Sequence, residues 1–184
     1  CKNSGARTMA RGNVSNTGLM MARLCYDLLM EKGRDALDAV DRHQVTPELE
    51  DVVEASIYLS GLGFENGGLA AAHAINDGFA QEPQAHGMYH GEKVAFGTLT
   101  QLVLERAPEE ELEQVLSFLK DTGLPMTLAQ LGVKEVVPET LKKVAEAACV
   151  PTQSTRNLRA DIAAQEVYDA ILEADRMGRA YLAR

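Results

Sequence analysis

No run of apolar residues in the 184-residue sequence approaches the roughly 20 that a helix needs to cross a bilayer. The first residues, CKNSGARTMARG, also lack the charged-then-apolar order of a signal peptide. Positive charge is scarce, because 18 Lys and Arg stand against 27 Asp and Glu, for a net charge of -9. Such a surface repels nucleic acid phosphates and anionic lipid head groups, so we expect no nucleic acid and no membrane as partner.

Cysteine is also scarce, and no CxxC pair is present. Cys1, Cys25 and Cys149 are widely spaced and odd in number. This pattern favours a reducing, cytoplasmic location over a disulfide framework. We interpret Cys25 and Cys149 as small core residues on apolar helix faces.

The common catalytic and nucleotide-binding motifs are missing as well. The sequence has no GxGxxG after a strand, no GxxxxGK[ST] and no GxSxG. The acidic run Glu109–Glu111 is typical of a solvated helix face. By spacing alone, this sequence either carries metal-centred chemistry or carries none.

Apolar residues recur with the period of helices, and no segment alternates as a strand does. The pattern predicts one all-α domain over residues 1–184. It places helices at 16–32, with Gly33 as the stop, and then at 34–42. Thr46 and Pro47 are typical of a helix start.

The second half of the chain shows the same period. Helices are expected at 69–77 and 90–106, with a loop at 79–89 between them. A turn of helix is predicted at 127–131, and Asp161 is predicted to cap a long final helix.

The stretch 61–105 has the highest density of chemically informative residues. It reads GLGFENGGLAAAHAINDG, a short polar loop, and HGEKVAFGTLTQLVLE. His73 and His90 each lie beside small residues, which leave room for a cavity. A single histidine on an apolar helix is more often a core residue, but two in this setting favour metal ligands. Neutral imidazole is a common ligand of Zn²⁺ and Fe²⁺.

A catalytic metal site usually has three protein ligands, and the spacing leaves the third one open. Asp77 follows His73 by one helical turn, so it is a third ligand, a partner that orients the imidazole, or a solvated residue. Glu92 and His86 are further candidates. His43 lies in a polar helix end, DRHQ, and we expect it at the surface.

Several longer strings carry a family resemblance. They are SGARTMARG, VTPELEDVVEASIYLSGLGFENGG, AAAHAINDG, YHGEKVAFG, GLPMTLAQLGVKE and VAEAAC. With them, nearly the whole chain resembles the glycerol dehydrogenase branch of the iron-containing, or group III, alcohol dehydrogenase family. The resemblance implies a helical bundle like the C-terminal domain of the dehydroquinate synthase-like, group III alcohol dehydrogenase fold.

The resemblance also implies roles for individual residues. His73 and His90 match two metal ligands, with zinc expected rather than iron, and His73 also borders the substrate. Phe64, in GFENGG, matches an aromatic residue of the alcohol pocket. The family's aspartate ligand falls in a segment before residue 1, so Asp77 is expected to assist the site or lie at the surface.

Two positions depart from the family pattern. Asn76 replaces a frequent second histidine, and Asn66 replaces a frequent serine. Asparagine forms hydrogen bonds but does not take up a proton as histidine does. A proton-relay role at position 76 is therefore doubtful, whereas the two-histidine assignment is unaffected.

The implied reaction is the oxidation of glycerol to dihydroxyacetone by an NAD-dependent enzyme. The resemblance also implies a homo-oligomer. Because residue 1 is Cys, we expect the chain to begin inside a longer protein with an N-terminal NAD-binding α/β domain. The 184 residues alone are then expected to be inactive. The alternatives are a non-catalytic helical binding or assembly module and a dehydrogenase for another vicinal diol.

Overall fold

The structure is a computed structural model that describes residues 5–184, so Cys1 and the first residue of the SGARTMARG string lie outside the described residues. The chain divides into two compact units, which meet between Leu69 and Ala70 in the sequence. Helices dominate both, and the bridge between Arg7 and Asn13 is the only β-pairing in the described part. The predicted all-α fold is confirmed. None of the helices in residues 5–184 has the length and apolarity that a bilayer span requires.

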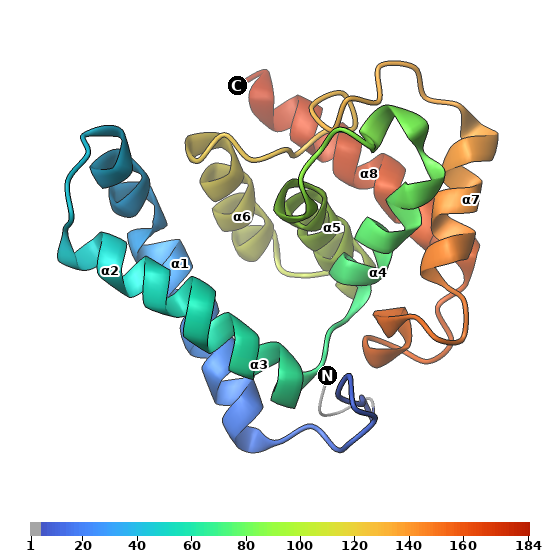
Figure 1. Ribbon diagram of the computed structural model, residues 1–184. Helices are drawn as coiled ribbons and strands as arrows, with labels where there is room; N and C mark the ends of the chain where they lie inside the picture. Colours follow the sequence, from blue (N-terminus) through green and yellow to red (C-terminus); the bar gives the residue numbers. More distant parts are fainter. Residues whose placement is uncertain (1–4) are drawn as a thin grey trace. The chain divides into compact units, whose positions relative to one another are not determined.

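The first unit is a pair of long helical segments that lie side by side (Figure 1). One segment is α1 (Asn16–Asp41). The other is continuous and runs through α2 (Pro47–Glu54), the π-helical turn η2 (Ala55–Leu59) and α3 (Ser60–Gly67). Helix α1 packs against all three parts of the second segment.

Side-chain caps define the helix starts in this unit. The Gly18 amide donates to Ser15 Oγ over 2.9 Å, and the Leu49 amide donates to Thr46 Oγ1 over 3.3 Å. Both starts agree with the sequence. The predicted stop at Gly33 is wrong, because α1 continues through it to Asp41. An interior glycine costs a helix only about 1 kcal/mol, and packing of α1 against α2 offsets that cost.

The core of the first unit is small. Cys25 lies at its centre, where its Sγ donates to the Ala55 carbonyl oxygen over 3.4 Å at the start of η2. Burial raises the pKa of the Cys25 thiol, which keeps it protonated and unreactive. The interpretation of Cys25 as a core residue is confirmed, while Cys149 is only half-buried. The cluster consists of Cys25, Ala55 and Leu59, with Met21, Leu28 and Leu29 packed against it.

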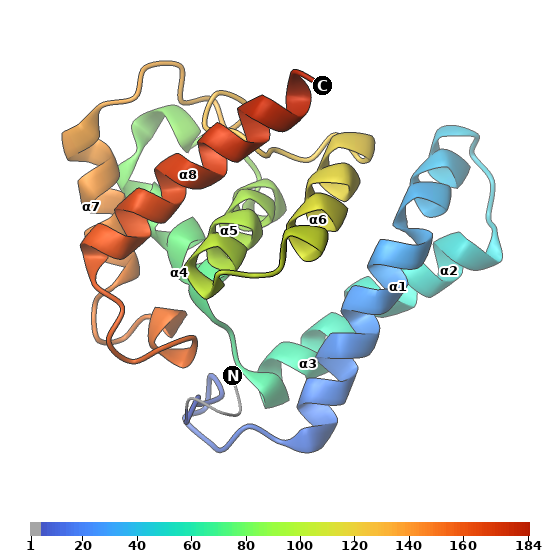
Figure 2. The ribbon, with the colours of Figure 1, turned by 180° about the vertical axis from the view of Figure 1, so that it is seen from behind.

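The second unit is built around one central helix, α5 (His90–Glu105). Helices α4 (Ala71–Gly78), α6 (Glu109–Asp121) and α8 (Ala164–Leu182) all pack against it. Helix α7 (Pro138–Ala148) packs against α4 and α8. Figure 2 shows α8 at the front of this unit, running beside α5, with α4 behind it.

Short 3₁₀ turns connect these helices: η3 (Phe79–Gln81), η4 (Pro83–Ala85) and η5 (Ser154–Asn157). The predicted helical turn at 127–131 is a hydrogen-bonded turn, in which the Leu131 amide donates to the Thr127 carbonyl. The core contains many fully buried large side chains, among them Phe79, Phe96, Ile75, Leu99, Met126, Leu128, Leu131, Leu141 and Ile171.

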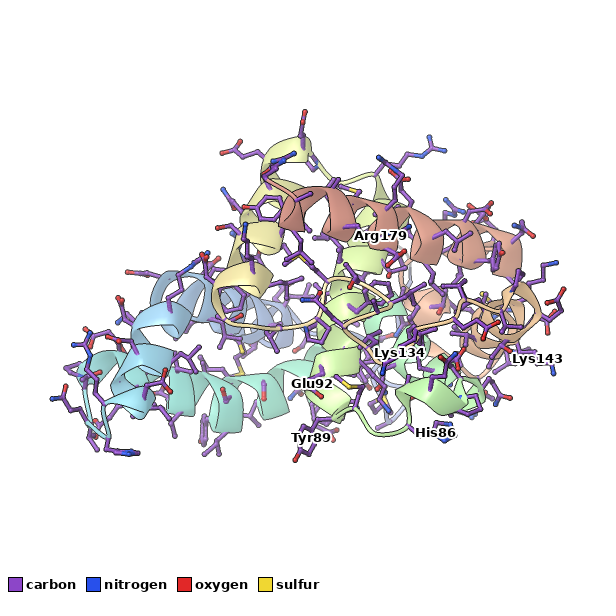
Figure 3. The ribbon with its side chains drawn as sticks, turned by 90° about the horizontal axis from the view of Figure 1, so that it is seen from above. His86, Tyr89, Glu92, Lys134, Lys143 and Arg179 are labelled. Carbon is purple, nitrogen blue, oxygen red and sulfur yellow. The ribbon has the colours of Figure 1, made fainter. Side chains whose placement is uncertain are left out.

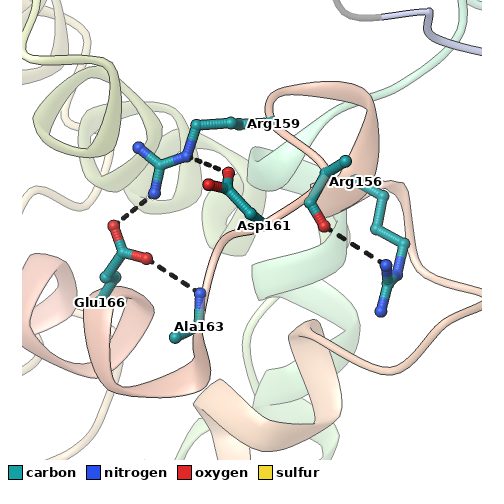
Figure 4. A network of polar contacts seen from close by, with 6 residues as sticks. Arg156, Arg159, Asp161, Ala163 and Glu166 are labelled. Atoms are coloured by element: carbon teal, nitrogen blue, oxygen red, sulfur yellow. Dashed lines mark hydrogen bonds and ion pairs between the residues drawn. The ribbon is translucent and has the colours of Figure 1, made fainter.

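The predicted cap of the last helix by Asp161 is wrong. Helix α8 begins at Ala164, where Glu166 Oε1 accepts from the Ala163 amide over 3.0 Å (Figure 4). A glutamate in this position satisfies an amide at the helix start that would otherwise have no partner. Asp161 instead pairs with the Arg159 guanidinium at 2.7 Å, and Arg159 also pairs with Glu166.

Candidate functional site

The two histidines singled out in the sequence lie next to each other in the second unit. His73 is near the middle of α4 and His90 is the first residue of α5. Their ring centroids are 5.6 Å apart, and the ring planes are inclined by 46°. His73 is half-buried and His90 is exposed. The predicted proximity is confirmed, and their role as metal ligands stays a prediction.

The close approach of α4 and α5 sets this spacing. A Cβ on Gly97 of α5 would lie 2.5 Å from the Ala72 carbonyl oxygen, so only glycine fits there. The Ala72 amide, at the open end of α4, donates to Gln101 Oε1 over 3.0 Å. Ala70 gives α4 no side-chain cap, so Gln101 of the neighbouring helix supplies the missing acceptor. Gln101 thus ties the helix of His73 to the helix of His90.

The electrostatic environment of His73 favours its neutral form. Burial is the largest cause that lowers the pKa of His73, followed by the electrostatic influence of the neighbouring His90 ring. The carboxylate of Asp77 acts in the opposite direction and is the weakest of the three. A neutral imidazole has a free nitrogen lone pair, which is what a metal ion requires.

Asp77 is held by two amide side chains. Asn76 Nδ2 donates to Asp77 Oδ1 over 3.0 Å, and Gln153 Nε2 donates to Oδ2 over 3.2 Å. Ser154 follows Gln153 in the chain, and its Oγ donates to the Ala70 carbonyl over 2.7 Å. The start of η5 therefore contacts both ends of α4. Both carboxylate oxygens of Asp77 already accept a hydrogen bond. This arrangement suits a residue that assists the site better than a third ligand.

The other candidate ligands have local structural roles. A His86 ring nitrogen lies 3.0 Å from the Ala80 carbonyl oxygen. Glu92 Oε2 accepts from the Tyr89 amide over 2.7 Å and so caps the N-terminus of α5 (Figure 3). His43 is exposed with a φ of 54° just after α1, as expected for a surface residue at a helix end. Within residues 5–184 the structure shows no group of three histidine, cysteine or acidic side chains arranged to hold a metal.

Phe64 belongs to α3 in the first unit, and its side chain is 37% exposed. Asn66, at the end of the same helix, donates to the Leu62 carbonyl over 2.9 Å. The role of Phe64 in an alcohol pocket stays a prediction.

A hollow of about 410 Å³ opens beside His90. Besides His90, its lining consists of Asn76, Asp77, Ala80 and Lys93. Sequence reasoning missed Lys93, Gln101 and Gln153. Lys93 follows His90 by three residues, so helical spacing was a usable signal for it. The two glutamines act across long stretches of chain and leave no local signal.

Comparison with known proteins identifies the family. No protein-family model matches the chain. It is 53% identical to a glycerol dehydrogenase of Escherichia coli O6:H1 over 182 residues, which cover 99% of this chain and 50% of that protein. It is 48% identical to a glycerol dehydrogenase of Pseudomonas putida over 179 residues, or 97% of this chain and 49% of the relative.

A solved structure agrees with these relatives. The crystal structure of glycerol dehydrogenase from Schizosaccharomyces pombe superposes with a TM-score of 0.92 at 40% identity. The match covers 98% of this chain and 47% of that one. The fold is therefore the one found in part of that glycerol dehydrogenase. The chain belongs to the glycerol dehydrogenase family and corresponds to the C-terminal part, about half the length of the curated relatives it matches.

Proposed function

We propose that the chain forms the metal- and substrate-binding part of an NAD-dependent glycerol dehydrogenase. The observation that carries this proposal is the pairing of His73 and His90, with ring centroids 5.6 Å apart, on two helices held together by Gln101. The names of its relatives support glycerol as the substrate. Dihydroxyacetone is the product that the family resemblance implies.

The two histidines suit a divalent metal ion, and zinc suits them better than iron by family resemblance. Two imidazoles on one tetrahedral zinc ion, with Zn–N bonds of about 2.0–2.1 Å, hold their ring centroids roughly 5 Å apart. The observed spacing is close to this value, and the lowered pKa of His73 keeps one donor nitrogen unprotonated. The third ligand is proposed to be the family's aspartate, from a segment preceding residue 1.

The residues of this chain then hold and orient the reacting groups. When bound, zinc supplies Lewis acidity that lowers the pKa of an alcohol, and NAD supplies the hydride acceptor. His73 and His90 fix the position of the ion relative to α4 and α5. Asp77, with its oxygens held by Asn76 and Gln153, places a negative charge beside His73 and supports its orientation.

Activity is proposed to require the NAD-binding α/β domain in addition to these 184 residues. We place only two of the three metal ligands in this chain and the nucleotide site in the α/β domain, so the chain alone is expected not to reduce NAD⁺ with glycerol. Reduction of NAD⁺ by the purified 184-residue chain would contradict this part of the proposal. Homo-oligomeric assembly and a cytoplasmic location stay predictions from the sequence.

The full-length protein provides the test of function. We expect zinc-loaded protein to reduce NAD⁺ with glycerol, and its kcat/KM for glycerol to exceed that for 2,3-butanediol. A higher kcat/KM for butanediol would keep the enzyme class and change the substrate to another vicinal diol. Zinc-loaded full-length protein without activity on any polyol would contradict the proposal and favour a helical binding or assembly module.

A further inference from the structure

Lys93 lies on α5 one helical turn after His90, on the same side of the helix. It lines the 410 Å³ hollow together with Asn76 and Asp77. On α4, His73, Asn76 and Asp77 are spaced three and four residues apart, so they also share one face. The hollow is therefore a continuation of the surface that carries the two histidines.

The side chain of Lys93 is half-buried, and its ammonium group has no partner among the residues that the structure describes. It forms no ion pair with any residue in 5–184, even though Asp77 lines the same hollow. By contrast, Lys32 in the first unit pairs with Asp51. A lysine can cover its apolar stem and keep its charged end accessible, so the ammonium can donate to a molecule that enters the hollow. Each oxygen of Asp77 accepts one hydrogen bond, from Asn76 or Gln153, and has a second lone pair for a ligand, while the Lys93 ammonium remains available to donate to the same ligand.

The chemistry of the hollow fits a hydroxylated molecule. Lys93 offers a charged donor, and Asp77 offers acceptor oxygens beside it. A hydroxyl group both donates and accepts, so it satisfies this pair of neighbours. A phosphate group suits it poorly, because the Asp77 carboxylate repels a second anion. The volume is at the lower end of ligand pockets, which favours a small molecule over a dinucleotide.

We propose that Lys93 is a substrate-binding residue that donates a hydrogen bond to a polyol hydroxyl adjacent to the reacting carbon. This inference rests on the proposed function and adds the residue that distinguishes a polyol from a simple alcohol. Lys93 acts on the hydroxyl that does not react, so its removal weakens binding more than it slows the chemical step.

The test compares Lys93→Met with Lys143→Met in the full-length protein. Lys143 lies on α7, is exposed and also has no ion pair, and Figure 3 shows it far from the start of α5. We expect Lys93→Met to raise the KM for glycerol about tenfold, as loss of one charge-assisted hydrogen bond does. The kcat for glycerol, the KM for NAD, the bound zinc and the kcat/KM for 2-propanol are expected to change by less than about twofold.

Two further measurements complete the test. Lys93→Arg keeps a charged donor and is expected to restore at least part of the glycerol affinity, whereas Lys143→Met is expected to behave as wild type. Three results for Lys93→Met would overturn the role of Lys93 without touching the proposed function. They are an unchanged KM for glycerol, a fall in kcat/KM for 2-propanol as large as that for glycerol, and a raised KM for NAD. A wild-type protein that does not oxidise glycerol would overturn the proposed function and this inference with it.

Discussion

The two compact units differ in how they use apolar side chains. The unit of residues 70–184 encloses large side chains completely, including Phe79, Phe96 and Leu99. The unit of residues 5–69 has a small core around Cys25 and leaves Met20 and Ile57 72% and 74% exposed. Two helical segments enclose little volume between them, whereas five helices surround a full core.

The histidine pair lies in the unit with the larger core, which is the arrangement that a metal site needs. Metal ligands have to be held to within a fraction of an ångström, and only packed neighbours provide that precision. Gly97 and Gln101 act through close contact of α4 with α5 and depend on this packing. The first unit has its own hollow of about 810 Å³ near Tyr58, but no histidine lines it.

Truncation of one leucine in each unit provides the largest test of this difference. Leu99→Ala removes a side chain that is 0% exposed and is expected to lower the free energy of unfolding by about 3 kcal/mol. Leu24→Ala removes a side chain that is 50% exposed and is expected to lower it by less than about 0.5 kcal/mol. Chemical denaturation followed by circular dichroism measures both. Equal losses would contradict the contrast between the two cores.

Two glycine substitutions test the backbone contacts in the same way. Gly97→Ala places a Cβ 2.5 Å from the Ala72 carbonyl oxygen and is expected to lower the free energy of unfolding by about 2 kcal/mol. It is also expected to weaken zinc binding, because α4 and α5 have to move apart. The control is Gly61→Ala in α3, where no atom lies within 4 Å. There, alanine is expected to raise stability by about 0.5–1 kcal/mol. A tolerated Gly97→Ala with unchanged zinc affinity would disprove the role of this close approach.

A buried carboxylate in the second unit gives the smallest expected effect. Glu82 is 1% exposed, and its Oε2 has no hydrogen-bond partner in the described structure. Its Oε1 accepts from the backbone and side-chain nitrogens of Gln84 over 3.0 and 3.2 Å.

Glu82→Gln keeps the Oε1 acceptor and removes a buried carboxyl group whose second oxygen has no partner among the described residues. It is therefore expected to raise the free energy of unfolding at pH 7 by about 1 kcal/mol. The matched control is Glu135→Gln, an exposed position expected to change stability by less than about 0.5 kcal/mol. Destabilisation by Glu82→Gln would show that Oε2 has a partner that stabilises its charge.

Local signals in the sequence predicted most helix starts, because a cap acts within a few residues. Thr46 illustrates this, since its hydroxyl accepts from an amide three residues later. The signals failed where tertiary packing or a competing side chain prevailed, as at Gly33, which α1 passes through, and at Asp161, whose capping role Glu166 takes.

The histidine pair was only partly predictable. Small residues around His73 and His90 pointed to a shared site, and the 5.6 Å spacing confirms their proximity. What fixes that spacing was not predictable, because Gln101 meets Ala72 across 29 positions and Gln153 meets Asp77 across 76. Such contacts depend on how helices pack, which the periodicity of single segments does not determine.

The most direct test of the account is zinc binding by the full-length protein, measured by calorimetric titration for wild type, His73→Ala and His86→Ala. The account predicts one zinc ion per chain in wild type and at least about hundredfold weaker binding in His73→Ala, which loses a ligand. His86, bound only to the Ala80 carbonyl, is the control and is expected to leave affinity unchanged. Wild-type affinity in His73→Ala would contradict the assignment of the histidine pair.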